Sequence, residues 1–269
     1  MKIFLDKSKL KHFILDKDNL GFVPTMGALH KGHISLIQKS KKSCSMTIVS
    51  IFVNKPQFNN KKDYIKYPRI LSRDISILKK LKIDILYLPK ERQIYPKGSN
   101  KKIVISSFQK QLCGKFRPGH FKAIVDVIDR FIQIINPKKI FFGEKDKQQL
   151  EIIKDFVNKN YKNTKVVECK TIRETNGIAY SSRNLLLSTM QKKIASNIYK
   201  LLSKNKKILI KKKSLIEIYT KRIKKMGAEH VDYIKVININ SIMKKNNKNK
   251  KYKIFVAYYL GKVRLIDNF

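Results

Sequence analysis

The sequence lacks several features that define other classes of protein. It has only three cysteines, Cys44, Cys113 and Cys169, which are far apart and odd in number, so neither a disulfide framework nor a cysteine-based zinc site is expected. It contains no run of about 18 or more uncharged apolar residues, which a membrane-spanning helix would need. Charged side chains interrupt residues 1–15, so no signal peptide is expected there. We therefore expect a protein of the reducing cytoplasm.

Acidic residues are also scarce, because 61 lysines and arginines face only 19 aspartates and glutamates, for a formal net charge of +42. A charge of this size alone would suggest nucleic acid or an anionic surface as a partner. However, only nine of these residues are arginine, whose planar guanidinium suits phosphate and guanine, and the lysines are spread over the whole chain. Lysine, isoleucine and asparagine all have A/T-rich codons, so compositional drift is a sufficient cause. We expect no specific nucleic-acid partner and no membrane partner.

Short apolar runs alternate with helical patterns through the first two-thirds of the chain, and the 42% of hydrophobic residues suffice for a core. Strands are predicted at residues 20–24, 46–53, 83–88, 103–106, 139–142 and 166–172. Helices are predicted at residues 34–42, 71–81, 121–135 and 148–158. This alternation indicates an α/β fold with a Rossmann-like, doubly wound parallel sheet, in which ligands bind at the carboxyl ends of the strands. We assign residues 1–176 to this domain.

The pattern changes after about residue 177. Helices are predicted near residues 190–204 and 214–225, and strands at residues 231–236, 254–259 and 263–266. Residues 244–251, with the sequence KKNNKNKK, read as a solvated loop. We assign residues 177–269 to a smaller C-terminal α+β domain.

A glycine-containing segment, residues 23–33 (VPTMGALHKGH), joins the first predicted strand to its helix. Gly27 can adopt backbone angles closed to other residues, and Gly32 allows a ligand to approach closely. His30 and His33 are three residues apart, a spacing that places both imidazoles on one face of a helical first turn. A helix start already favours phosphate, and imidazoles there can donate hydrogen bonds to ATP and stabilise charge that develops at phosphorus. We therefore favour a phosphate site over two surface histidines.

These motifs resemble those of one family. Residues 30–33 (HKGH) resemble the HxGH signature of the nucleotidylyltransferase superfamily, and residues 24–33 (PTMGALHKGH) resemble the narrower signature of pantothenate synthetases, or pantoate–β-alanine ligases. Further matches follow in the family's order: SIFVN at 50–54 with QF at 57–58, YPR at 67–69, IYP at 94–96, RPGHF at 117–121, FGEKD at 142–146 with QQ at 148–149, SSRN at 181–184 and RLIDN at 264–268. Together they cover nearly the whole chain.

The resemblance implies an ATP-dependent ligase that activates pantoate as an adenylate, releasing pyrophosphate, and joins it to β-alanine, releasing AMP. It implies catalytic roles for His33, His30 and Lys145. It implies ATP binding by Met26, Gly27, Ala28, Leu29, His30, Lys31, Gly32, His33, Gly143, Glu144, Lys145, Asp146, Ile172, Tyr180, Ser181, Ser182 and Arg183. Gln57 and Gln149 would bind pantoate and β-alanine through neutral amides, which leave the attacking carboxylate charged.

Further expectations follow from the resemblance. Magnesium should accompany ATP, and Asp74 is a candidate ligand for it. The alternative is that Asp74 is only a solvated residue on a helix. His120 is expected to shape the pocket, and the protein is expected to be a homodimer. The chain departs from the family pattern at Lys55-Pro56, Lys122, Lys147 and Tyr180, none of which removes a polar group with an assigned role. Two alternatives are another nucleotidylyltransferase, which would keep the nucleotide on its product, and a basic nucleic-acid-binding protein without catalysis.

Overall fold

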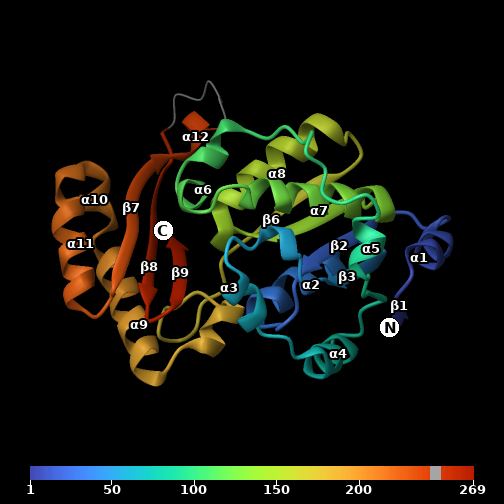
Figure 1. Ribbon diagram of the computed structural model, residues 1–269, viewed down its shortest axis with the longest axis horizontal. Helices are drawn as coiled ribbons and strands as arrows, with labels where there is room; N and C mark the ends of the chain where they lie inside the picture. The colour runs from blue at the N-terminus through green and yellow to red at the C-terminus, as the bar shows by residue number, and fades with distance from the viewer. Residues whose placement is uncertain (243–249) are drawn as a thin grey trace.

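In the computed structural model, which describes residues 1–242 and 250–269, a large parallel sheet with helices on both faces stands beside a small antiparallel sheet (Figure 1). The large sheet has the strand order β1-β4-β3-β2-β5-β6, and every neighbouring pair is parallel. Its strands are β1 (Lys2–Phe4), β2 (Leu20–Thr25), β3 (Met46–Ile51), β4 (Ile85–Tyr87), β5 (Lys139–Gly143) and β6 (Lys165–Cys169). Most of the loop predicted at residues 244–251 lies outside the described residues.

Alternate residues of the central strands build two hydrophobic cores, because successive side chains of a strand point to opposite faces. Phe22 and Ile48 are paired in register and pack against α1 (Lys7–Ile14), α7 (His120–Ile135) and α8 (Lys147–Asn160). Their neighbours Val23 and Val49 pack on the other face against α2 (Lys31–Ser43) and α4 (Leu71–Lys80). Helices therefore cover both faces, and the predicted doubly wound parallel sheet is confirmed.

The C-terminal unit is a small antiparallel sheet with helices on the face turned away from the large sheet (Figure 1). Its strands pair in the order β7-β8-β9. The elements are α9 (Thr189–Lys204), α10 (Lys206–Lys211), α11 (Ile216–Lys225), β7 (His230–Asn238), α12 (Ile239–Ile242), β8 (Tyr252–Leu260) and β9 (Val263–Asn268). The opposite face of this sheet carries Tyr233, Phe255 and Ala257, which join the core under α7. The small sheet thus packs against the core of the large sheet through this face. The predicted domain boundary at residue 177 stays a prediction.

Short elements complete the connections. They are the helices α3 (Lys61–Lys66), α5 (Glu91–Ile94) and α6 (Cys113–Phe116) and the 3₁₀ turns η1 (Lys55–Gln57), η2 (Ser107–Lys110), η3 (Glu144–Asp146), η4 (Ser182–Leu186) and η5 (Lys213–Leu215). The strand predicted at residues 103–106 is wrong: Ile103 is buried, but the neighbouring Val104 is 85% exposed and the segment joins no sheet. The three cysteines are free, as expected. No helix of the described residues is long and apolar enough to cross a membrane.

Candidate active site

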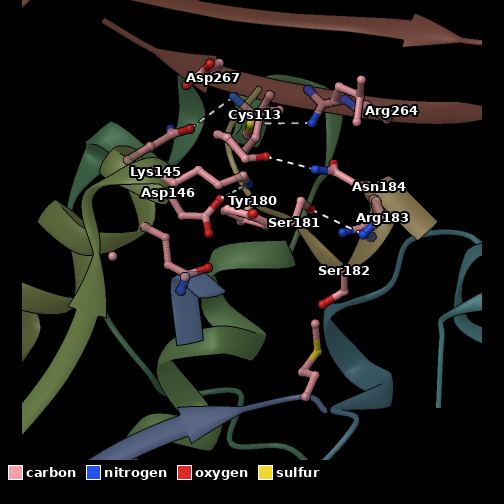
Figure 2. Close-up of a pocket in the computed structure, with 18 of the residues that line it drawn as sticks. Cys113, Lys145, Asp146, Tyr180, Ser181, Ser182, Arg183, Asn184, Arg264 and Asp267 are labelled. Carbon is pink, nitrogen blue, oxygen red and sulfur yellow. Dashed lines mark hydrogen bonds and ion pairs between the residues drawn. The ribbon is translucent and has the colours of Figure 1, made fainter. Parts of the chain in front are cut away.

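A cavity of about 1200 Å³ opens at the carboxyl ends of β2, β3, β5 and β6, between the large sheet and the C-terminal unit. Figure 2 shows side chains from distant parts of the chain around this space, with Lys145 and Asp146 facing Tyr180 to Arg183, and Arg264 and Asp267 on the strand above them. Pockets for one small ligand usually measure about 300–1,000 Å³. The cavity therefore has room for more than one small substrate.

The loop between β2 and α2 is held in an unusual conformation at one edge of the cavity. Gly27 and Ala28 both have left-handed backbone angles, with φ of 79° and 50°. A Cβ at Gly27 would lie 3.0 Å from Oδ2 of Asp74 and 3.1 Å from Ile51, so a side chain there would be crowded as well as strained. Asp74, on α4, accepts hydrogen bonds at 2.8 Å from the backbone N–H groups of both Ala28 and Leu29. Its carboxylate therefore fixes the loop that leads into α2.

His30 and His33 lie together at the start of α2. His30 is the N-cap residue, and its Nδ1 accepts a hydrogen bond from the backbone N–H of Gly32 at 3.1 Å, which leaves the ring proton on Nε2. The two imidazoles stack with ring centroids 4.0 Å apart, and the ring of Tyr180 lies parallel to His30 at 6.1 Å. A Cβ at Gly32 would lie 2.9 Å from the His30 ring, so the glycine makes room for this histidine.

Both imidazoles are neutral at physiological pH. Burial, with the nearby His33 and Lys145, lowers the pKa of His30 to about 2. Burial also lowers the pKa of His33 to about 4; Asp146 opposes this shift and Lys145 adds to it. Nδ1 of His33 is buried and has no hydrogen-bond partner among the described residues. The pair can therefore act as neutral hydrogen-bond donors, while the cationic charge of the site comes from lysine and arginine.

The turn after β5 brings Lys145 into the cavity. Its Nζ lies 3.2 Å from Oδ1 of Asp146, within η3. Nδ2 of Asn268, near the end of β9, donates hydrogen bonds at 2.9 Å to the carbonyl oxygens of both Glu144 and Lys145. Sequence reasoning assigned no role to Asn268, because a contact across more than 120 residues leaves no local pattern. The C-terminal strand thus fixes the turn that carries Lys145.

The segment 180–183 lies across the start of α2. The hydroxyl of Ser182 donates to the carbonyl of Ala28 at 3.2 Å, and the backbone N–H of Tyr180 donates to the carbonyl of Ile172 at 3.0 Å. Arg183 forms an ion pair with Asp63 at 2.9 Å. The segment therefore places two serine hydroxyls and a guanidinium in the lining of the cavity, beside the start of α2.

Gln57 and Gln149 line the same cavity. Nε2 of Gln57 lies 3.0 Å from the sulfur of Met26, and its Oε1 accepts a hydrogen bond from Asn54 at 3.1 Å. The backbone carbonyl of Gln57 accepts hydrogen bonds from Nδ1 of His120 at 2.7 Å and from Arg117 at 3.1 Å. His120 thus shapes the pocket through the backbone of Gln57. Arg117 also touches Nε2 of His120 at 2.8 Å, a contact that sequence reasoning missed.

Not every predicted residue lines the cavity. Its lining includes Met26, His30, Gly32, His33, Gln57, Gly143, Lys145, Asp146, Gln149, Ile172, Tyr180, Ser181, Ser182 and Arg183. Gly27, Ala28, Leu29, Lys31, Glu144 and Asp74 are absent from the lining. Leu29 is buried in the core beneath α2, whereas Lys31 is exposed with its Nζ 5.9 Å from the centroid of the Tyr180 ring. These residues support the site from behind or from its rim.

Residues 1–242 and 250–269 contain no group of three or more histidines, cysteines or acids able to hold a metal ion. Asp74 is 1% exposed, and each of its carboxylate oxygens accepts a backbone hydrogen bond. The carboxylate therefore supports the loop before α2 from outside the cavity lining, and the role of Asp74 as a magnesium ligand stays a prediction.

Lys147, where the family pattern has an aromatic residue, is a buried residue of the cavity lining. Its Nζ lies 2.6 Å from Glu151 and 2.5 Å from Glu168, and Glu168 also pairs with Lys154. Burial alone would lower the pKa of Lys147, but the hydrogen bonds to these two glutamates raise it above its usual value. The two glutamates therefore compensate the positive charge of Lys147. The lysine that replaces the aromatic residue is thus accommodated at the start of α8.

A twisted parallel sheet with helices on both faces, a cavity at the strand ends and a helix start that carries two histidines define a class of α/β enzymes that bind nucleotides. The pantoate–β-alanine ligase family model matches residues 2–269. A pantothenate synthetase of Flavobacterium psychrophilum is 41% identical over 97% of this chain and 95% of its own length, and one of Francisella tularensis subsp. novicida is 42% identical over 97% and 92%. The chain belongs to the pantoate–β-alanine ligase family.

Solved structures agree with this assignment. A pantoate–β-alanine ligase of Francisella tularensis, complexed with β-γ ATP and β-alanine, superposes with a TM-score of 0.84 at 38% identity and covers 100% of this chain and 97% of its own. A pantothenate synthetase of Thermus thermophilus superposes with a TM-score of 0.86 at 29% identity and covers 100% and 99%. The whole fold, including the C-terminal unit, is therefore shared with these enzymes.

Proposed function

We propose that this protein joins pantoate to β-alanine in two steps at the cavity described above. In the first step, a carboxylate oxygen of pantoate attacks the α-phosphorus of ATP, and pyrophosphate leaves. In the second, the amine of β-alanine attacks the acyl carbon, loses a proton, and displaces AMP to form pantothenate. The observation that carries the proposal is the convergence of His30, His33, Lys145 and the segment 180–183 on one cavity in a chain that matches the family from end to end.

The first step relies on groups that stabilise charge at the phosphates. Neutral His30 and His33 are placed to donate hydrogen bonds near the start of α2, where the helix dipole favours an anion. Lys145 and Arg183 supply positive charge, and the hydroxyl of Ser181 supplies a further donor. Because these groups are fixed before the substrates arrive, they act without reorganising as charge develops.

In the second step, the protein mainly has to align the amine of β-alanine with the acyl carbon of the adenylate. Gln57 and Gln149 are expected to hold the substrates through amide groups, which leave the pantoate carboxylate charged and nucleophilic. Alignment of the two reacting groups accounts for much of the acceleration. No covalent enzyme intermediate is required. Magnesium is expected to accompany the phosphates of ATP.

The direct test is to mix the purified protein with ATP, magnesium, pantoate and β-alanine and to identify the products. We expect pantothenate, AMP and pyrophosphate in equal amounts. A product that retains the nucleotide would instead indicate another nucleotidylyltransferase. We also expect a cytoplasmic homodimer, as the family resemblance implies, and light scattering of the purified protein measures its mass in solution.

A further inference from the structure

Arg117 is unusual among the cations that line the cavity. Arg183, Lys145, Lys147 and Arg264 each form an ion pair with an aspartate or glutamate. Lys62, Lys66, Lys170 and Lys262 are exposed to solvent. Arg117 is shielded from solvent in part, yet no carboxylate of the described residues lies within ion-pair distance of its guanidinium. The cavity therefore holds one sheltered positive charge that the described part of the protein does not compensate.

The contacts of Arg117 fix its orientation and leave donors free. One N–H group meets Nε2 of His120 at 2.8 Å, and another meets the carbonyl of Gln57 at 3.1 Å. A guanidinium has five N–H groups, so three remain without a protein partner among the described residues. Burial, together with Arg183 and Arg264, lowers the pKa of Arg117 to about 10, so it stays charged at neutral pH. Sheltering such a charge without an anion is unfavourable, which points to an anionic ligand.

The substrates provide three anionic groups that Arg117 could bind: the phosphates of ATP, the carboxylate of pantoate and the carboxylate of β-alanine. Their different parts in the reaction decide among them. The phosphates of ATP have their own receptors at the start of α2 and in Lys145 and Arg183. The carboxylate of pantoate is the nucleophile, and a guanidinium pair would withdraw the charge with which it attacks. The carboxylate of β-alanine takes no part in bond making. Pairing it with Arg117 leaves the amine reactive and satisfies both charges.

We propose that Arg117 binds the carboxylate of the amino-acid substrate and makes the enzyme selective for amines that carry a carboxylate. This proposal rests on the proposed function. Gln57 links the two substrate regions, because its backbone carbonyl accepts from Arg117 while its side chain contacts Met26 in the loop before α2. Nε2 of His120 contacts the other terminal nitrogen of the guanidinium. The amino acid is thereby anchored at its far end, with its amine directed toward the adenylate.

The test compares two amines of equal length, β-alanine and 3-aminopropanol, which differ in the negative charge. The unmodified protein should use β-alanine with a kcat/KM about 100-fold higher, as expected when a charged hydrogen-bond donor loses its partner. The substitution Arg117→Gln should lower this ratio about 10- to 100-fold, mainly through the KM for β-alanine, and Arg117→Lys should restore part of it. Lys66→Gln, which removes an exposed charge at the cavity, is the matched control and should leave the ratio unchanged.

Exchange of labelled pyrophosphate into ATP with pantoate alone reports the first step separately in the same preparations. Arg117→Gln protein that keeps this exchange while its amine preference collapses supports the proposal. An unchanged amine preference overturns it, whether exchange is kept or lost, since Arg117 would then serve the phosphates or pantoate. Equal use of both amines by the unmodified protein also overturns it and needs no variant. If the unmodified protein shows neither exchange nor pantothenate formation, the proposed function itself fails.

Discussion

At the scale of single residues, the site depends on side chains whose charge is set by their surroundings. His30 and His33 are neutral because burial lowers their pKa values, so the site we propose for the phosphates would use them as neutral donors rather than as cations. Both carboxylate oxygens of Asp74 accept hydrogen bonds from backbone N–H groups of the loop before α2. Residue type alone therefore gives neither the charge state nor the contacts of a side chain, since two histidines are neutral here and an aspartate accepts backbone hydrogen bonds.

Replacement of His33 by alanine should lower the rate of adenylation about 10²- to 10³-fold, or about 2.7–4 kcal/mol, because a preorganised donor is lost from the transition state. Its ring stacks on His30 and makes no hydrogen bond through Nδ1 to the described residues, so the fold should survive. Pantoate-dependent pyrophosphate exchange measures the rate, and thermal unfolding checks the fold. His12→Ala, at an exposed histidine of α1, is the control. Parent-like exchange by folded His33→Ala protein would show that the histidine is structural.

Asn268 should matter although it lies outside the motifs to which chemistry was assigned. Asn268→Asp removes the N–H groups that hold the carbonyls of Glu144 and Lys145, so the turn that carries Lys145 loses two hydrogen bonds worth about 1 kcal/mol each. We expect the adenylation rate to fall about 10-fold, with little change in the KM for β-alanine. Asn205→Asp is the matched control, because that amide also donates to a backbone carbonyl but lies at the end of α9. Equal effects of both substitutions would contradict a positioning role.

Much of the site was predictable at this scale, and the reason for each miss is physical. His30, His33 and Gly27 lie within one short segment, so their spacing carries the information that the fold later uses. Asn268 and Arg117 reach their partners across the tertiary structure, about 120 and 60 residues away. No periodicity in the sequence reports such contacts.

At the scale of elements, the prediction succeeded where the hydrophobic pattern was long and failed where it was short. The buried strands β2, β3 and β5 and the long helix α7 follow unbroken or strongly periodic apolar patterns. The short strand β1 was missed because three residues define no pattern, and its pairing with β4 is decided by the sheet. Residues 103–106 looked like a strand from composition, yet they join no sheet and mainly bury Ile103.

The loop that leads into α2 gives a test at this scale. Asp74→Asn replaces an acceptor of two backbone hydrogen bonds with a group that can accept only at one oxygen, leaving a buried N–H unsatisfied at a cost of about 1–3 kcal/mol. We expect a lower midpoint of urea unfolding and slower adenylation. The magnesium concentration that gives half-maximal activity should stay the same. A marked increase in that concentration would instead support Asp74 as a magnesium ligand.

At the scale of the whole molecule, the cavity exists because two units meet. Arg173 joins them through a two-pronged ion pair with Asp267 at 2.6 and 2.9 Å, and Asn268 reaches from the same strand to the turn after β5. The small sheet therefore determines both the cover of the cavity and the placement of Lys145. The charges to which chemistry is assigned are few among those that give the net charge of +42, and they line the cavity.

Three histidines that are buried or partly buried, His30, His33 and His120, should make stability fall as the solution becomes acidic. Burial is the main cause that lowers the pKa of His30, His33 and His120, to about 2, 4 and 3. In the unfolded chain they titrate near 6.5, so between about pH 6.5 and 4 the unfolded state binds more protons than the native state. Their contribution is therefore fully present above about pH 6.5 and is lost as the pH falls below it. Urea unfolding between about pH 7.5 and 5 measures this loss, and a constant free energy of unfolding across that range would contradict neutral, buried histidines.

The central claim is that pantoate is activated before the amine enters, and isotope exchange tests it most directly. The protein is incubated with ATP, magnesium and labelled pyrophosphate, with or without pantoate, and β-alanine is left out. Because an adenylate formed in the cavity can react backward with pyrophosphate, label should enter ATP only when pantoate is present. Exchange that requires β-alanine as well would contradict the two-step account.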